Sequence, residues 1–389
     1  MAQIQQGQFN RHRIRHSPQL FSAIDNLSAV AEPLSTPKDL PIGERGIVNM
    51  GQTCFIGCVL QGMLHCPPCR GYFLSDKHQR GACAARSKGQ LCISCIVDSI
   101  YLEAFSSPSP MIVPHNILQA LFDKGSHMAG YSMQDSHEFF GELLRLWEAN
   151  AAENGVADKC PTSKLFEGAL VSSLICENEK CGHKSNQTEA FKDISLEIPS
   201  GKDVPDELTI NDCLAKFTAK ESLATVDGAM CEKCKAKTVA KQYQLVTLPP
   251  VLVLHLKRFE IGIGKGGSKK GEKESRKIDT PVEAPNTLNL LPFCADEPTR
   301  RSVLPSNPYR MSPGVPALRG ELDYHAAHYD LHGVIVHKGK LNEGHYISYC
   351  RHHRDYRWFL ADDHKVTPLA SNEVPRKKGY LLFYSKRMW

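Results

Sequence analysis

The chain has 389 residues, of which 41% are hydrophobic, so it is long enough to bury the core of one large domain or two of ordinary size. Its 47 basic and 42 acidic residues leave a formal charge of +5, a mild excess that identifies no partner. Fifteen cysteines, an odd number, fit neither a small disulfide scaffold nor a fully paired set. Because no stretch has the pattern of a secretory signal or a membrane span, we expect an intracellular protein whose clustered cysteines bind metal or do chemistry.

The first half of the chain is predicted to be helical. Residues 1–44 are polar, carry the basic run RHRIRH and a segment rich in breakers, and are predicted to form a flexible leader. Apolar residues recur at helical spacing from Phe55 to Leu64, which places Cys54 where a loop meets a helix. A second helix is predicted from Ser136 to Trp147, with one apolar stripe.

The second half is predicted to be rich in strands. After residue 165 the sequence changes to short apolar runs typical of β-structure: ALVSSLIC, VLVLHL, YDLHGVIVH, GHYISYC and GYLLFYS. Helices followed by strands predict an α+β fold. Residues 261–277, rich in Gly and Lys, and residues 294–320, rich in Pro, Arg and Ser, are predicted to be mobile insertions.

Cys54 is the candidate nucleophile, because a helix N-terminus favours a thiolate. Asn49, just before it, has a side-chain amide suited to stabilising an oxyanion. A cysteine that opens a helix is more often structural, so the assignment needs a partner. His345 stands before a predicted strand, and Asp362 and Asp363 end the next, which predicts a nucleophile, a base and an orienting carboxylate.

Taken together, these segments resemble the ubiquitin-specific proteases. GIVNMGQTCFIGCVLQGMLHC resembles their Cys box, and YDLHGVIVHKGKLNEGHYISYC with WFLADDHKVTP resembles their His box. AGYSMQDSHEFFGELL is similar to the Gln-Asp box, and LVTLPPVLVLHLKRFE to a further family strand. The resemblance implies that Cys54 is the nucleophile, Asn49 the oxyanion-stabilising residue, His345 the base and Asp362 the orienter, with Asp363 in support. It further implies that Gln134, Asp135 and Tyr346 contact the ubiquitin tail.

The resemblance also implies the architecture and the reaction. A papain-like fold is expected for residues 45–389, with a helical thumb at about 45–160 and a β-rich palm and zinc-ribbon fingers at about 161–389. The expected reaction is hydrolysis of the isopeptide bond after the ubiquitin C-terminal glycine. Gln52, Gly57, Ala284 and Ala361 depart from the family pattern. Because Ala361 replaces a large aromatic beside Asp362, we expect a slow enzyme that partner proteins accelerate.

Two cysteine clusters predict structural zinc. Two cysteine pairs, 50 residues apart, have the layout of a tetrahedral zinc ribbon: Cys176, Cys181, Cys231 and Cys234. The C-x4-C spacing of the first pair makes Cys176 the weakest ligand assignment. A second set has the composition of a closed Cys3His site: His78, Cys83, Cys92 and Cys95. Cys66 and Cys69 in HCPPC are the competing ligands, although we interpret them as structural residues at a helix end.

The second cluster resembles the branch of the family that serves the SAGA coactivator as its histone deubiquitinase. That branch implies a nuclear protein, or one also found in the cytoplasm, which meets SAGA-type subunits and nucleosomes. A further Cys/His cluster of the branch is represented here by Cys160, so a third zinc is not expected. The branch's N-terminal zinc-finger domain has no counterpart before Cys54, which leaves open whether the sequence is a fragment.

Two other functions compete with this interpretation. One is a catalytically weak relative that binds ubiquitin as an adaptor, and it is disfavoured because the nucleophile, base and orienter are all present. The other is a zinc-ribbon protein that binds nucleic acid through the basic loop Lys265–Lys277. We interpret that loop as a solvated insertion.

Overall fold

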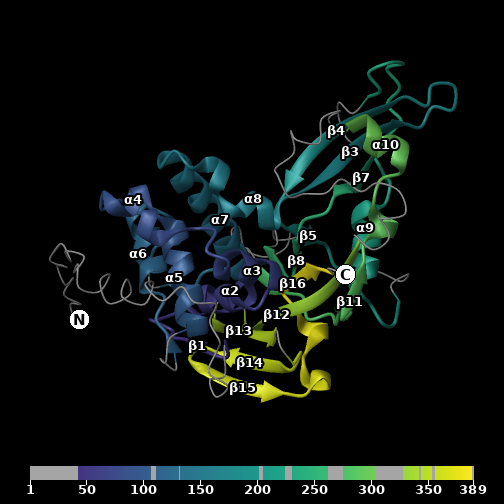
Figure 1. Cartoon of the computed structure of the whole chain (residues 1–389). Helices are drawn as coiled ribbons and strands as arrows, with labels where there is room; N and C mark the ends of the chain where they lie inside the picture. The colour runs from purple at the N-terminus through teal and green to yellow at the C-terminus, as the bar shows by residue number, and fades with distance from the viewer. Residues whose placement is uncertain are drawn as a thin grey trace, which may run out of the picture.

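The computed structural model describes residues 43–106, 111–130, 132–200, 205–223, 230–261, 275–303, 327–340, 343–352 and 355–387. Most of the predicted leader and parts of both predicted insertions, residues 262–274 and 304–320, lie outside this set. The described chain divides into a helical half, a large sheet beside it and a narrower sheet that projects from the body (Figure 1).

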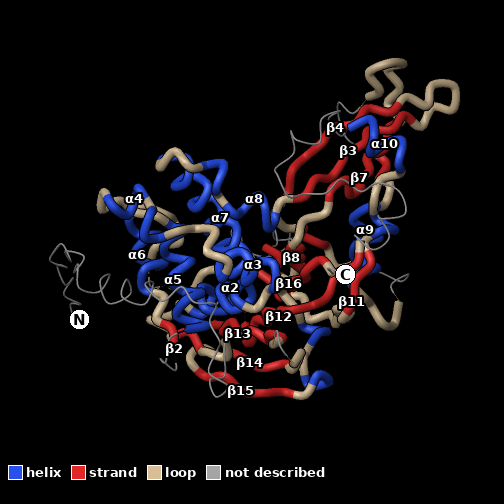
Figure 2. The backbone as a smooth tube through the Cα atoms, in the orientation of Figure 1, coloured by secondary structure: helices blue, strands red, loops and turns tan. Residues whose placement is uncertain are grey.

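Helices dominate the described chain up to residue 166, and strands dominate after it (Figure 2), so the α+β prediction is confirmed. The first group comprises α2 (Cys54–Leu64), α3 (Pro67–Leu74), α4 (Ala84–Ser87), α5 (Ile93–Ser106), α6 (His115–Asp123), α7 (Ser136–Glu153) and α8 (Pro161–Phe166). Two more helices, α9 (Ile210–Thr218) and α10 (Glu297–Val303), lie among the strands.

The eight-stranded sheet carries the second half of the site. Its order is β15 (Lys365–Leu369), β14 (Trp358–Asp362), β13 (Glu343–Arg351), β12 (His328–Lys340), β16 (Leu381–Lys386), β8 (Val251–Leu256) and β5 (Ile194–Leu196), with β11 (Thr287–Asn289) beside β12. The projecting sheet has the order β4 (Lys184–Phe191), β3 (Gly168–Cys176), β7 (Val239–Thr247) and β6 (Glu221–Ser222). Two short pairs complete the set: β1 (Gly46–Ile47) with β2 (Met111–Ile112), and β9 (Phe259–Ile261) with β10 (Ser275–Lys277).

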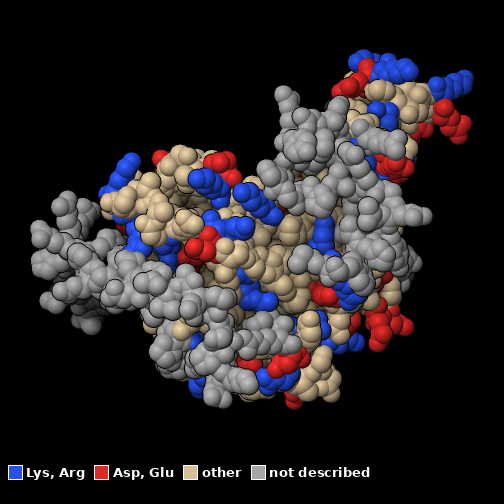
Figure 3. Space-filling view, in the orientation of Figure 1, with Lys and Arg blue, Asp and Glu red and all other residues tan. Residues whose placement is uncertain are grey.

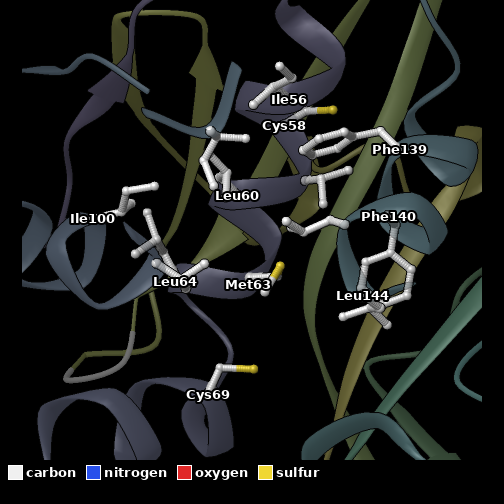
Figure 4. Packing of buried hydrophobic residues seen from close by; sticks show 14 of the residues in the cluster. Ile56, Cys58, Leu60, Met63, Leu64, Cys69, Ile100, Phe139, Phe140 and Leu144 are labelled. Carbon is white, nitrogen blue, oxygen red and sulfur yellow. The ribbon is translucent and has the colours of Figure 1, made fainter. Parts of the chain in front are cut away.

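Helix α2 is buried along its whole length between α7 and the large sheet. Side chains of α5 and α7 gather around it (Figure 4). The Phe55 and Phe139 rings meet edge to face, with their centroids 5.4 Å apart. A Cβ at Gly62 would lie 2.8 Å from the Phe383 ring, so glycine is needed where the helix crosses the sheet. A helix packed on all sides holds Cys54, its first residue, in a fixed position.

Several boundaries differ from the sequence predictions. Pro67 does not simply end a helix: it opens α3, a position where its missing N–H costs nothing, and Cys66 is the N-cap. Residues 297–303 of the predicted second insertion form α10, since Asp296 Oδ1 accepts from the Thr299 N–H and the Ala295 N–H bonds to Leu245.

The C-terminal end of the predicted basic loop is also structured. Arg276 in β10 pairs with Glu260, and Lys277 Nζ donates to the carbonyl oxygen of His337 at 2.9 Å. On the surface, basic and acidic side chains lie side by side at the tip of the projecting sheet (Figure 3). The loops at the ends of its strands carry both charges, with Glu179 and Lys180 between β3 and β4, and Glu232, Lys233 and Lys235 before β7. Among the described helices, none is long and apolar enough to cross a membrane.

Candidate active site

The loop before α2 is shaped by the side chain of Asn49. Its Oδ1 accepts from the backbone N–H groups of Thr53 at 2.9 Å and Gly51 at 3.1 Å, an Asx-type turn. Gly51 and Gln52 both have left-handed backbones, with φ of 102° and 55°. This turn delivers Cys54 as the first residue of α2, with its side chain 4% exposed.

The predicted base and orienter come together across two neighbouring strands. β13 pairs antiparallel with β14, as the sequence predicted, and Asp362 is the last residue of β14. His345 Nε2 donates to Asp362 Oδ1 at 2.7 Å. A hydrogen bond with Cys54, together with that to Asp362, raises the pKa of His345 to about 9 against the opposing effect of burial. Since Nε2 faces Asp362, Nδ1 is the ring nitrogen left for the thiol. The three side chains thus have the order thiol, imidazole and carboxylate, which is the order that a nucleophile–base–orienter triad requires.

Asp363 binds a different partner from Asp362. Its Oδ2 accepts from Asn49 Nδ2 at 3.1 Å and lies 3.9 Å from His345 Nε2, too far for a hydrogen bond. The Asn49 amide is therefore fixed through both of its ends, and Nδ2 keeps a second N–H for an incoming oxyanion. The two adjacent carboxylates thus have different partners: Asp362 bonds to the His345 imidazole, and Asp363 bonds to the Asn49 amide.

Asp135 is engaged within the protein on both carboxylate oxygens. As the N-cap of α7, its Oδ1 accepts from the His137 and Glu138 N–H groups at 2.7 and 3.0 Å. Its Oδ2 accepts from the hydroxyls of Tyr346 at 3.2 Å and Tyr380 at 2.5 Å. Tyr380 is the residue that the sequence reasoning missed, because a tyrosine within a predicted strand carries no local signal of its partner.

Gln134 and Tyr346 are the two other residues that were expected to contact the ubiquitin tail. The Gln134 amide donates to Ser132 Oγ at 2.9 Å, a contact within the segment before α7. Tyr346 is 3% exposed, follows His345 in β13 and packs on His337, with ring centroids 4.7 Å apart. The neighbouring Gln52 Oε1 accepts from the Met133 N–H at 2.7 Å and so ties the loop before α2 to the segment before α7.

The first cysteine cluster sits at the tip of the projecting sheet. The ligand atoms of Cys176, Cys181, Cys231 and Cys234 all lie within 4.8 Å of one another. Cys176 and Cys234 Sγ are 3.6 Å apart, and Cys181 and Cys231 Sγ are 3.9 Å apart. Tetrahedral zinc with bonds of about 2.3 Å requires sulfurs about 3.8 Å apart, so these four donors fit the ion.

The second cluster lies beside the helical half. The ligand atoms of His78, Cys83, Cys92 and Cys95 lie within 4.8 Å of one another, and His78 Nε2 is 3.0 Å from Cys95 Sγ. This set also has the donor chemistry and spacing of a closed zinc site. The competing thiols of Cys66 and Cys69 are fully buried and belong to none of the three groups of potential ligands found among the described residues. All fifteen cysteines are free of disulfides.

Comparison with known proteins agrees with this geometry. The family model of ubiquitin carboxyl-terminal hydrolases matches residues 45–384. The chain belongs to this family. The human ubiquitin carboxyl-terminal hydrolase 27 is 33% identical over 375 residues, which cover 89% of this chain and 80% of that protein. Human ubiquitin carboxyl-terminal hydrolase 22 is 31% identical over 374 residues, and there the match spans 66% of the relative.

Solved structures place the chain near one branch of the ubiquitin carboxyl-terminal hydrolases. The structure of the SAGA DUB module of Ubp8, Sgf11, Sus1 and Sgf73 bound to monoubiquitin matches with a TM-score of 0.71 and 28% identity, covering 96% of this chain and 76% of that one. The same module bound to ubiquitin aldehyde matches with a TM-score of 0.69 and 28% identity, covering 96% of this chain and 76% of that one. The chain is therefore a cysteine-type deubiquitinase related to the SAGA branch.

Proposed function

We propose that this deubiquitinase hydrolyses the isopeptide bond after the C-terminal glycine of ubiquitin, with Cys54 as nucleophile, His345 as base and Asp362 as its orienter. The observation that carries the proposal is the position of His345, whose Nε2 bonds to Asp362 Oδ1 at 2.7 Å and whose pKa is raised to about 9, chiefly by Cys54. Its raised pKa means that the imidazole readily holds the proton it takes from the thiol, leaving a thiolate at the N-terminus of α2.

The proposed reaction has two steps. The Cys54 thiolate attacks the glycine carbonyl, and the N–H of Asn49 stabilises the oxyanion that forms. His345 then donates its proton to the departing lysine amine, and a water molecule hydrolyses the acyl-enzyme. Asp135 supports the ubiquitin tail indirectly, because its bonds to Tyr346 and Tyr380 hold the tyrosines that border the site.

Zinc has a structural role in this proposal. Cys176, Cys181, Cys231 and Cys234 would hold one ion, and His78, Cys83, Cys92 and Cys95 a second. A bound ion would tie together the loops that carry its ligands and would contribute folding free energy there. Residues 45–160 would form the thumb, and residues 161–389 would form the palm and the fingers. The fingers would be the projecting sheet with the first cluster, and they would grip ubiquitin.

Hydrolysis of ubiquitin with a C-terminal fluorogenic amide tests the catalytic assignment. Cys54→Ala is expected to lower kcat by several orders of magnitude while ubiquitin affinity stays within a few-fold. Cys213→Ala is the matched control, since it removes a buried thiol from α9, outside the site. Equal activity of Cys54→Ala and Cys213→Ala would disprove the nucleophile.

For the cellular role, we propose a SAGA-type module and monoubiquitinated histone in nucleosomes as partner and substrate, with a nuclear location. Support comes from the 31% identity to hydrolase 22 and the TM-score of 0.71 with a SAGA module. The test compares kcat/KM on monoubiquitinated nucleosomes and on the fluorogenic amide, with and without module subunits. Partner subunits that bind the chain and raise turnover support the role, whereas unchanged turnover and no complex would contradict it.

A further inference from the structure

A small cavity lies directly behind Cys54, between α2 and strands β13 and β14. Its lining includes Cys54, Gly57, Gln61, Ser348, Ala361 and Asp363, and its volume is about 10 Å³. A cavity needs about 10–15 Å³ by this measure to hold one water molecule, so the space is of the size of a single water. Gly57 and Ala361, two of the smallest residues, are part of its lining.

Two residues of the lining, Gln61 and Ser348, each carry a buried side-chain oxygen that lacks a partner among the described residues. Gln61 is 1% exposed and Ser348 is 0% exposed. Gln61 Oε1 has no hydrogen-bond partner among the described residues, and Ser348 Oγ has none there besides a contact with the Cys350 thiol. The Gln61 amide is fixed at its other end, since Nε2 donates to the carbonyl oxygen of Arg45 at 2.6 Å. Unpaired buried oxygens destabilise a protein, and a bound water is the usual way in which such groups are satisfied.

The third polar group of the lining belongs to the catalytic centre. Asp363 lines the cavity and accepts from Asn49 Nδ2 at 3.1 Å. A water molecule in the cavity could bond to all three polar groups. It would donate one hydrogen bond to Gln61 Oε1 and one to the Asp363 carboxylate, and it would accept one from the Ser348 hydroxyl. Three bonds are the typical number for a buried water.

We propose that this cavity binds one ordered water, and that Gln61 and Ser348 act through it as positioning residues for Asp363 and Asn49. The water stabilises the carboxylate that orients the Asn49 amide, and so sets the direction of the N–H that meets the oxyanion. The catalytic consequence rests on the proposed function, because it requires Asn49 to act in the reaction.

Ala361 offers a matched pair of variants for the test. It lies opposite Ser348 in the register of β13 and β14, and valine and threonine have nearly the same shape. Ala361→Val fills the cavity with an apolar group and displaces the water, so we expect a melting temperature below that of the wild type. Ala361→Thr supplies a hydroxyl in place of the water, so its melting temperature should exceed that of Ala361→Val. A dry cavity predicts the opposite order, with Ala361→Val at or above the wild type.

Kinetics and crystallography complete the test. Ala361→Val should lower kcat about ten-fold, with KM within two-fold, since misorientation of a stabilising group acts on the transition state. A crystal structure of the full chain with ordered solvent should show a water within hydrogen-bond distance of Gln61 Oε1 and Ser348 Oγ, and a well-ordered empty cavity would overturn the proposal. If the wild type hydrolyses no ubiquitin reporter, the proposed function fails, whereas the density and the order of melting temperatures still decide the water site.

Discussion

Replacing Asp362 by asparagine tests whether one carboxylate or two orient the His345 ring. In a triad whose carboxylate is unique, the change from acid to amide costs about 10⁴ in kcat. Here Asp363 Oδ2 lies 3.9 Å from the same Nε2. Reaching hydrogen-bond distance requires a movement of about 1 Å. That movement would weaken the bond of Asp363 to Asn49. Because Asp363 can replace part of the lost contact, we expect a smaller fall, about 10²–10³ in kcat.

The companion variants separate the two carboxylates. Asp363→Asn releases Asn49 but leaves the bond from His345 to Asp362 intact, so we expect a loss of about ten-fold to a hundred-fold. The double variant should lose about 10⁴ or more, because no carboxylate then faces the imidazole. The assay is kcat and KM on ubiquitin with a C-terminal fluorogenic amide, with Asp355→Asn, a carboxylate paired with Arg357 away from the site, as control. A larger loss for Asp363→Asn than for Asp362→Asn would refute the assignment of Asp362 as orienter.

Three further predictions concern stability, pH and metal. Asp135→Ala removes a helix cap and the acceptor of two tyrosine hydroxyls, so it should lower the free energy of unfolding by about 2–4 kcal/mol. Asp135→Asn can still cap the helix, so it should cost about half as much. Equal losses for the two variants in denaturant unfolding would contradict the network of Asp135 with the two tyrosines. The pKa of His345 is raised from 6.5 to about 9 in the folded protein, so its stabilising effect is complete below about 6.5 and is lost as pH rises through about 9. The unfolding free energy of the wild type relative to His345→Ala should therefore fall between pH 7 and 10, and a constant difference would count against the pair with Cys54. Elemental analysis should find about two zinc ions per chain in the wild type and about one in Cys231→Ser. In that variant the projecting sheet should lose protection from amide exchange, while α2 keeps it. A zinc content well below one per chain in the wild type would show that the clusters do not bind zinc.

Those features that depend on periodicity and spacing were predictable from the sequence. Helix α2 and strand β8 lie where apolar patterns predicted them, because burial of one face dictates such patterns. The cysteine clusters were predictable because two pairs at short spacing bring four donors together once two loops meet. The approach of His345 to Asp362 followed from the expectation of adjacent antiparallel strands.

Contacts between distant side chains were not predictable in the same way. The division of labour between Asp362 and Asp363 depends on the backbone of Asp363, whose φ of 52° turns its side chain toward Asn49. The bonds of Tyr380 to Asp135 join residues 245 positions apart, and no local pattern marks such a pair. The ordered helix α10 was missed because a composition rich in Pro and Arg hid the cap formed by Asp296 and Thr299.

The proposed mechanism depends most on Cys54 as the thiol that attacks the ubiquitin C-terminus. Incubation of the full chain with ubiquitin carrying an electrophilic C-terminal group, followed by mass spectrometry of the digested adduct, tests it directly. If Cys54 is the nucleophile, one covalent adduct per chain forms on the peptide that contains Cys54, and this adduct is lost in Cys54→Ala. No adduct, or an adduct on another of the fifteen cysteines, would contradict it.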